Sequence, residues 1–240
     1  MKVRGHIPNA ITSLNLLCGV VGVVFALSGR PDIAFYLMLA AAVCDFCDGF
    51  AARLLHAYSP VGKELDSLAD MVSFGVLPSV MLYDLMHSAG NALWLSLTPL
   101  LLAVSSGLRL AKFNVDERQH TSFLGLPTPA CAMACGSIAA FCHFKPLSPF
   151  TALCSGVWFI PAVTLALCIL LVCELPMFSF KSGSECSNIE GMKRTAFFCI
   201  AVPVIVIVAV LGLNWTMAVL GTIAAYILEN LIFAAFRIRG

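Results

Sequence analysis

Long apolar runs separated by short polar connections make up most of this chain of 240 residues. A run of about 20 apolar residues has the length of a helix that crosses a bilayer core of roughly 30 Å. Such runs are predicted near residues 10–28, 32–53, 66–87, 92–111, 127–144, 153–174, 195–213 and 215–236. The pattern therefore predicts an all-α fold, a polytopic bundle of about eight transmembrane helices.

The composition supports a membrane protein and argues against nucleic acid as a partner. Hydrophobic residues account for 60% of the chain and charged residues for 11%, and the mean hydropathy is +0.95. A soluble domain of this length could not cover its surface with so few charges. The formal net charge of +1 provides no basic excess to neutralise the phosphates of a duplex. The 11 cysteines are spread through the apolar runs, where we expect them to fill helix interfaces.

The distribution of basic residues predicts the orientation of the chain. Eight spans would place both termini on one side, and only Arg30 and Lys145, two of the 14 Lys and Arg residues, fall on the other side. The others lie in the N-terminal segment, alternate connections and the C-terminal tail: Lys2, Arg4, Arg53, Lys63, Arg109, Lys112, Arg118, Lys181, Lys193, Arg194, Arg237 and Arg239. Because cytoplasmic loops are enriched in Lys and Arg, we expect an N-in, C-in topology in a bacterial inner (cytoplasmic) membrane.

Four aspartates lie close together in the sequence, in two pairs. Asp45 and Asp48 are three residues apart and Asp66 and Asp70 are four apart, so on helices each pair presents two carboxylates on one face. If the two faces meet, the carboxylates repel one another unless a counter-charge lies among them. Hard oxygen ligands are typical of Mg²⁺, Mn²⁺ or Ca²⁺. The sequence therefore predicts a divalent-metal site.

The predicted topology places this site at the cytoplasmic ends of spans two and three. Their connection is expected to be a loop in which Ser59, Pro60 and Gly62 interrupt the helix. The segment 109–114 ends span four on the same side, and the connection 176–194 is expected to be a flexible cytoplasmic loop. Soluble cytoplasmic compounds could thus reach the aspartates.

The aspartates belong to a longer pattern, D-x-x-D-G-x-x-A-R, then eight residues, then G-x-x-x-D-x-x-x-D. The chain matches each fixed position: Asp45, Asp48, Gly49, Ala52, Arg53, Gly62, Asp66 and Asp70. A chance match at a given starting position is on the order of one in ten billion from average residue usage. The pattern resembles the signature of the CDP-alcohol phosphatidyltransferase family, membrane enzymes in which an alcohol hydroxyl displaces CMP from a CDP-linked lipid.

Further segments resemble the membrane-bound phosphatidylserine synthases of that family: residues 7–12, 66–76, 109–114 and 123–130. The resemblance covers roughly residues 1–135, interpreted as the catalytic helices, and residues 136–240 are interpreted as further transmembrane helices of the same domain. It implies transfer of the phosphatidyl group from CDP-diacylglycerol to the hydroxyl of L-serine, giving phosphatidylserine and CMP. It also implies a homodimer in the lipid membrane.

The residues of the pattern suit that chemistry. A diphosphate at the membrane edge must be neutralised, and two divalent cations, Mg²⁺ or Mn²⁺, held by the four aspartates would bind its oxygens. Arg53 can add a bidentate phosphate contact, and the small residues allow either close approach of a nucleotide or tight helix packing. The residues expected to contact the CDP-lipid are Asp48, Gly49, Ala52, Arg53, Gly62 and Asp66.

The acceptor hydroxyl needs a base within hydrogen-bond reach, and the family resemblance assigns that role to Asp70. A serine carboxylate would need a cationic partner near the metals. Arg109 is the first candidate and Lys112 the second, although either could serve only to anchor the topology. Glu229, near the end of span eight, is expected to face a cavity or a neighbouring helix.

Three other functions remain open. The first is the same reaction with glycerol 3-phosphate or inositol phosphate, whose phosphate favours several basic residues around the pocket. The second is a divalent-cation transporter with the aspartates as the ion path. Against it, the aspartates cluster at one membrane face and the glycines and Arg53 of the pattern would have no role. The third is a membrane assembly protein without activity, which intact metal ligands argue against.

Overall fold

The computed structural model describes residues 6–57, 59–115, 123–177 and 188–237. Within these ranges the chain is helical except for two strands of two residues each, β1 (Phe123–Leu124) and β2 (Pro176–Met177), which pair antiparallel. The expected all-α architecture is therefore confirmed, with one short strand pairing added.

Most helices form long rods that follow the predicted apolar runs. The first rods are α1 (His6–Leu27) and α2 (Pro31–Leu54). The third rod joins α3 (Pro60–Asp70), the π-helical segment η2 (Met71–Val76) and α4 (Leu77–Ser88), and the fourth joins α5 (Leu93–Ser96), η3 (Thr98–Leu100) and α6 (Leu101–Val115). The remaining helices are α7 (Thr128–Phe144), α8 (Pro149–Cys154), α9 (Phe159–Val172), α10 (Asn188–Val210) and α11 (Trp215–Arg237).

Five of these rods are long and apolar enough to cross a membrane: α1, α2, the third rod, the fourth rod and α11. The other predicted spans fall on α7, α9 and α10, whose apolar parts are shorter among the described residues. Large apolar side chains on the outer helix faces are exposed, such as Leu17 at 55% and Val24 at 60% on α1, and Phe46 at 69% on α2. Apolar outer faces of this extent match a lipid environment, and the chain is an integral membrane protein.

Two boundary predictions are wrong. The third rod begins at Pro60, so Gly62 lies in the first turn of α3 and not in a loop. Ser59 caps this helix, because its hydroxyl oxygen accepts from the Gly62 N–H at 2.9 Å, and Pro60 suits a first turn whose amides have no intrahelical partner.

The connection 176–194 is also shorter than expected. Its first two residues form β2, and α10 already begins at Asn188, so residues 188–194 are helical. Polar residues in the first turns of α10 hid this start from a search for apolar runs. Residues 178–187 lie outside the described part of the chain.

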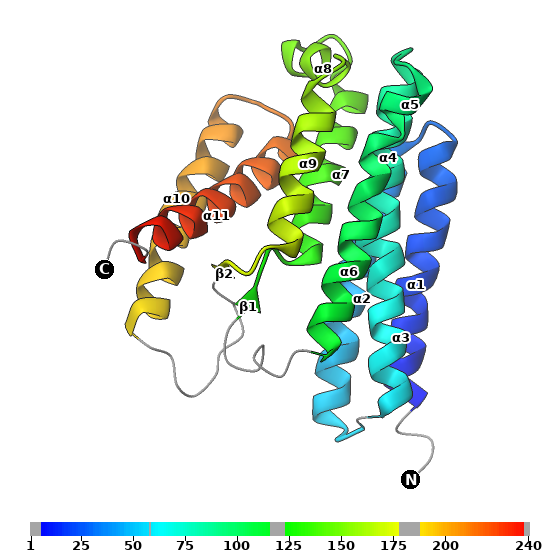
Figure 1. Ribbon diagram of the computed structural model, residues 1–240, viewed down its shortest axis with the longest axis vertical. Helices are drawn as coiled ribbons and strands as arrows, with labels where there is room; N and C mark the ends of the chain where they lie inside the picture. Colours follow the sequence, from blue (N-terminus) through cyan, green and yellow to red (C-terminus); the bar gives the residue numbers. More distant parts are fainter. Residues whose placement is uncertain (1–5, 58, 116–122, 178–187, 238–240) are drawn as a thin grey trace.

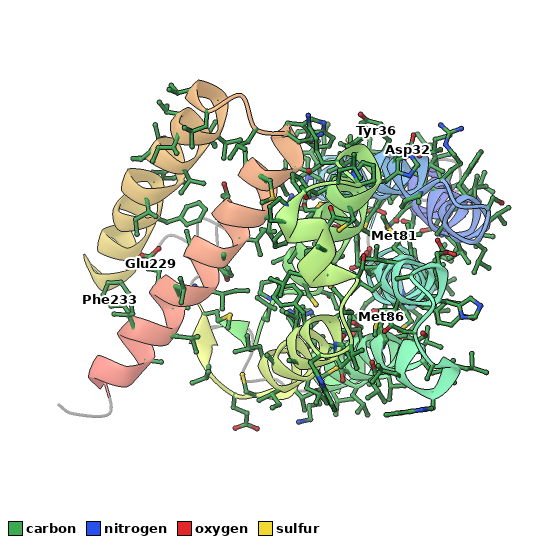
Figure 2. The ribbon with its side chains drawn as sticks, turned by 90° about the horizontal axis from the view of Figure 1, so that it is seen from above. Asp32, Tyr36, Met81, Met86, Glu229 and Phe233 are labelled. Atoms are coloured by element: carbon green, nitrogen blue, oxygen red, sulfur yellow. The ribbon has the colours of Figure 1, made fainter. Side chains whose placement is uncertain are left out.

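Figure 1 shows α1, α2, α4 and α6 running side by side, with α7 and α9 against them and the tilted pair α10 and α11 on the far side. Helix α7 is buried over most of its length, and its Gly136 leaves the space that Met38 and Phe35 of α2 occupy. In Figure 2, Met81 and Met86 lie within the main bundle, whereas Glu229 and Phe233 lie in the α10 and α11 pair. The α2–α3 connection lies at the same end of the bundle as the N-terminus (Figure 1).

Candidate metal and nucleotide site

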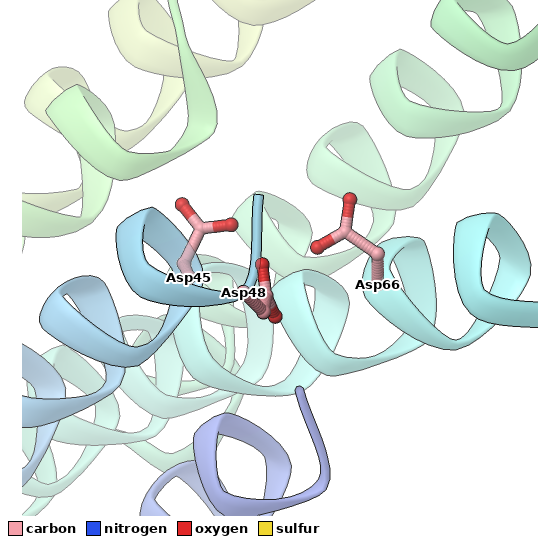
Figure 3. A group of neighbouring side chains, drawn as sticks. All are labelled: Asp45, Asp48 and Asp66. Carbon is pink, nitrogen blue, oxygen red and sulfur yellow. The ribbon is translucent and has the colours of Figure 1, made fainter. Parts of the chain in front are cut away.

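Three aspartates from two helices converge near the end of the bundle that carries the α2–α3 connection. Asp45 and Asp48 of α2 and Asp66 of α3 each offer a carboxylate oxygen, and these oxygens all lie within 4.8 Å of one another. Figure 3 shows the three carboxylates around the space between α2 and α3. The spacing of three residues puts Asp45 and Asp48 on one face of α2, and the short connection returns α3 antiparallel beside it.

The donor set suits a hard divalent cation. Asp48 Oδ2 and Asp66 Oδ1 are buried and have no hydrogen-bond partner among the described residues, and Asp48 is only 5% exposed. Buried carboxylates so close together repel one another unless a cation lies among them. Carboxylate oxygens are the ligand type that binds Mg²⁺ or Mn²⁺.

Asp70 is not a member of this three-residue group. It lies at the end of α3, one turn beyond Asp66, and within electrostatic reach of Asp45 and Asp66. Its Oδ1 accepts a hydrogen bond from the Asn15 amide of α1 at 3.3 Å. Asp70 is thus positioned beside the cluster, with one of its two oxygens turned toward α1.

The small residues of the sequence pattern surround the cluster in different ways. Gly49 is exposed, and a Cβ at this position would meet nothing within 4 Å, which leaves the backbone open to a ligand. A Cβ on Gly62 would come within 2.9 Å of Asn9 Oδ1 on α1, so this glycine permits close packing of α3 on α1. Ala52 is half-buried, and Arg53 is exposed at the end of α2.

Among the Lys and Arg residues whose side chains the structure describes, only Arg109 of α6 is buried, at 7% exposure. Its Nη1 donates to Thr128 Oγ1 of α7 at 2.8 Å, and it lies within electrostatic reach of Asp70. Thr128 follows a tight turn at Gly125, whose φ of +77° favours glycine. Lys112 is exposed one turn further along α6. The structure therefore brings Arg109, but not Lys112, into the buried interior near the aspartates.

Sequence reasoning missed the polar residues that α1 and α7 add to this region. Thr12 contributes to the electrostatic environment of Asp48, Asn15 donates a hydrogen bond to Asp70, and Thr128 accepts one from Arg109. One signal was present: Asn9, Thr12 and Asn15 recur every three residues in a mainly apolar run, and this spacing marks one face of a helix.

Glu229 is buried at 5% exposure on α11, in the electrostatic environment of Tyr226. In Figure 2 it lies in the α10 and α11 pair, apart from the bundle that carries the aspartates.

Comparison of the sequence with known proteins identifies its family. The sequence profile of the CDP-alcohol phosphatidyltransferase family matches residues 5–173. The chain belongs to the CDP-alcohol phosphatidyltransferase family. Members of this family generally use divalent cations, and the aspartate cluster could hold one.

Several curated members of the family are similar in sequence. The CDP-diacylglycerol–serine O-phosphatidyltransferase of Mycobacterium tuberculosis H37Rv is 39% identical over 178 residues, which cover 71% of this chain and 60% of that protein. The enzyme of the same name from Bacillus subtilis is 36% identical over 138 residues, covering 58% of this chain and 77% of that protein. An archaetidylserine synthase of Methanothermobacter thermautotrophicus is 32% identical over 148 residues, covering 59% and 61%. The chain spans about 60% of the length of the mycobacterial relatives.

Proposed function

We propose that this protein transfers the phosphatidyl group of CDP-diacylglycerol to the hydroxyl of L-serine, giving phosphatidylserine and CMP. The observation that carries the proposal is the convergence of Asp45, Asp48 and Asp66 within a chain that matches the family. The choice of serine draws on the relatives from bacteria, whose names specify serine as the acceptor.

The cluster is proposed to hold two divalent cations, Mg²⁺ or Mn²⁺, with Asp70 as the fourth ligand. When bound, such cations neutralise the diphosphate and polarise the phosphorus. The exposed guanidinium of Arg53 adds a phosphate contact, and the open backbone at Gly49 gives the nucleotide room. Asp48, Ala52, Gly62 and Asp66 complete the proposed CDP-lipid contacts.

Asp70 is proposed to accept the proton of the serine hydroxyl as the oxygen attacks phosphorus and the bond to CMP breaks. Arg109 is proposed to bind the serine carboxylate, since its buried, charged guanidinium lies within electrostatic reach of Asp70. Lys112 remains the second candidate, and its exposed position suits a contact at the mouth of the site.

Eight spans with both termini in the cytoplasm are proposed for the whole chain, and a bacterial inner membrane as its location. The cluster would then face the cytoplasm, where serine is available. A homodimer is proposed by family analogy, as is the division into catalytic helices over 1–135 and further helices over 136–240. The family match covers residues 5–173 and so includes α7 and α9 as well as the proposed catalytic helices.

The alternatives are less well supported by the geometry. A phosphorylated acceptor would favour several buried cations, whereas Arg109 is the only buried one among the Lys and Arg residues whose side chains the structure describes. A divalent-cation transporter would favour acidic groups along a path through the membrane, whereas Asp45, Asp48 and Asp66 gather near one end of α2 and α3.

The proposal can be tested with purified protein in detergent micelles that contain CDP-diacylglycerol. CMP release is measured with Mg²⁺ or Mn²⁺ and with each acceptor in turn: L-serine, glycerol 3-phosphate, inositol phosphate, or none. We expect L-serine to stimulate release most, and excess chelator to abolish it. A larger stimulation by glycerol 3-phosphate would transfer the assignment to the first alternative, and full activity in chelator would contradict the metal-dependent reaction.

A further inference from the structure

Asn15 of α1 is buried at 0% exposure and lies against Asp70, although it is outside the aspartate pattern. Its Nδ2 donates to Asp70 Oδ1 at 3.3 Å. A carboxylate offers only acceptors, so only this orientation of the carboxamide makes the bond. The other half of the carboxamide, Oδ1, is buried without a hydrogen-bond partner among the described residues. Because an unsatisfied buried carbonyl is unfavourable, packing alone does not account for an asparagine here, whereas the contact with Asp70 does.

The backbone of Asn15 is tied to the same segment that carries Asp70. The Ser73 hydroxyl donates to the Asn15 carbonyl at 3.0 Å, and Ser73 is fully buried three residues after Asp70. Ser73 lies in the π-helical segment η2, and such segments are frequent at functional sites. Two hydrogen bonds of opposite direction therefore join Asn15 to the stretch from Asp70 to Ser73.

Gly19, one turn beyond Asn15, sets the distance between the two helices. A Cβ at this position would lie 3.0 Å from the Ser73 Cα and would collide with its hydroxyl oxygen. Glycine thus lets α1 approach η2 as closely as the Ser73 bond to Asn15 requires. An asparagine side chain is short, so its contact with Asp70 depends on this close approach.

We propose that Asn15 is a positioning residue for Asp70. By binding Oδ1, the Asn15 amide fixes the rotation of the Asp70 carboxyl group and thereby the direction in which Oδ2 faces the proton of the acceptor hydroxyl. Oδ1 keeps a second lone pair, so this hydrogen bond does not compete with the proposed metal ligation. Asn15 acts through Asp70 and need not touch the substrate. The inference rests on the proposed function, in which Asp70 is the base.

The test is a double-mutant cycle of wild type, Asn15→Leu, Asp70→Asn and both changes together, with kcat measured from release of radiolabelled CMP at saturating serine. Asn15→Leu should lower kcat by about 10- to 100-fold, as is typical for loss of a residue that orients a ligand or base. The affinity for CDP-diacylglycerol should stay within about 2-fold of wild type. In the Asp70→Asn background the same change should lower kcat by less than about 2-fold, because the group that it orients has lost its role.

Equal losses from Asn15→Leu in both backgrounds would show a structural role and overturn the inference, as would an unchanged kcat in the single variant. Thr164→Val is the matched control, since Thr164 is a fully buried polar residue of α9 that the site does not use, and its kcat should equal that of wild type. If Asn15→Leu does not fold, Asn15→Ser, which is polar but too short to reach Asp70, takes its place in the same cycle. A wild-type protein that releases no CMP with serine would instead overturn the proposed function, and with it this inference.

Discussion

Removing one carboxylate from the cluster should stabilise the metal-free protein while it weakens the metal site. The cluster oxygens of Asp45, Asp48 and Asp66 lie within 4.8 Å of one another. Two unit charges at that distance repel by about 3.5 kcal/mol at an effective dielectric constant of 20. Asp48→Asn removes the two repulsive pairs that include Asp48, which amounts to about 7 kcal/mol at this separation before solvent and relaxation reduce it. The amide keeps the shape and one oxygen of the carboxylate.

The assay is thermal unfolding in detergent at pH 9, which is far above the ordinary pKa of a carboxyl group, with excess chelator or with Mg²⁺. If solvent and relaxation leave a quarter of the relief, about 2 kcal/mol, the melting temperature of Asp48→Asn in chelator should exceed that of wild type by roughly 4–8 °C. With Mg²⁺ the wild type should gain more than the variant, because a cation that binds only the folded state stabilises it in proportion to its affinity.

Asp84→Asn serves as the control, because Asp84 is a partly buried aspartate of α4 that is not part of the cluster. Its gain from Mg²⁺ should equal that of wild type. The electrostatic reasoning would be refuted by an Asp48→Asn protein that melts no higher than wild type in chelator and gains as much from Mg²⁺.

Two further predictions concern catalysis. Asp70→Asn keeps an oxygen but cannot accept a proton, so kcat should fall by roughly 10² to 10⁴. The binding of CDP-diacylglycerol, measured by titration, should weaken much less, and a loss of binding in proportion to the loss of kcat would make Asp70 a metal ligand only. Arg109→Lys replaces a bidentate guanidinium by a point charge, so steady-state kinetics should show a raised KM for serine and a nearly unchanged KM for CDP-diacylglycerol. An equal rise in both KM values would mark Arg109 as structural or as a diphosphate contact.

The aspartate cluster could be predicted from the sequence because it depends on local periodicity. Residues three apart share a helix face, which placed Asp45 and Asp48 together, and the short connection to α3 brought Asp66 beside them. The sequence pattern predicts too late a start for α3, because a glycine that closely follows a proline is typical of a loop. In the structure, α3 begins at Pro60, two residues before Gly62, and Ser59 is its N-cap.

Contacts between distant segments could not be predicted in the same way. Asn15 and Asp70 are 55 residues apart, and nothing in the sequence around Asn15 distinguishes a side chain that orients a carboxylate from one that packs between helices. The burial of Arg109 likewise depends on Thr128 of α7, 19 residues away across the short strand β1. Such contacts depend on how the helical rods pack against one another. The apolar runs in the sequence do not determine this packing.

The proposed function requires that release of CMP and attachment of serine to a lipid occur together at the aspartate cluster. Its most direct test is to reconstitute the protein in vesicles with CDP-diacylglycerol and radiolabelled L-serine, and to measure both CMP and lipid-bound serine over time. We predict one serine incorporated per CMP released, with both products abolished by chelator and by Asp66→Asn. Release of CMP without lipid-bound serine, or an Asp66→Asn protein that forms both products at the wild-type rate, would contradict the account.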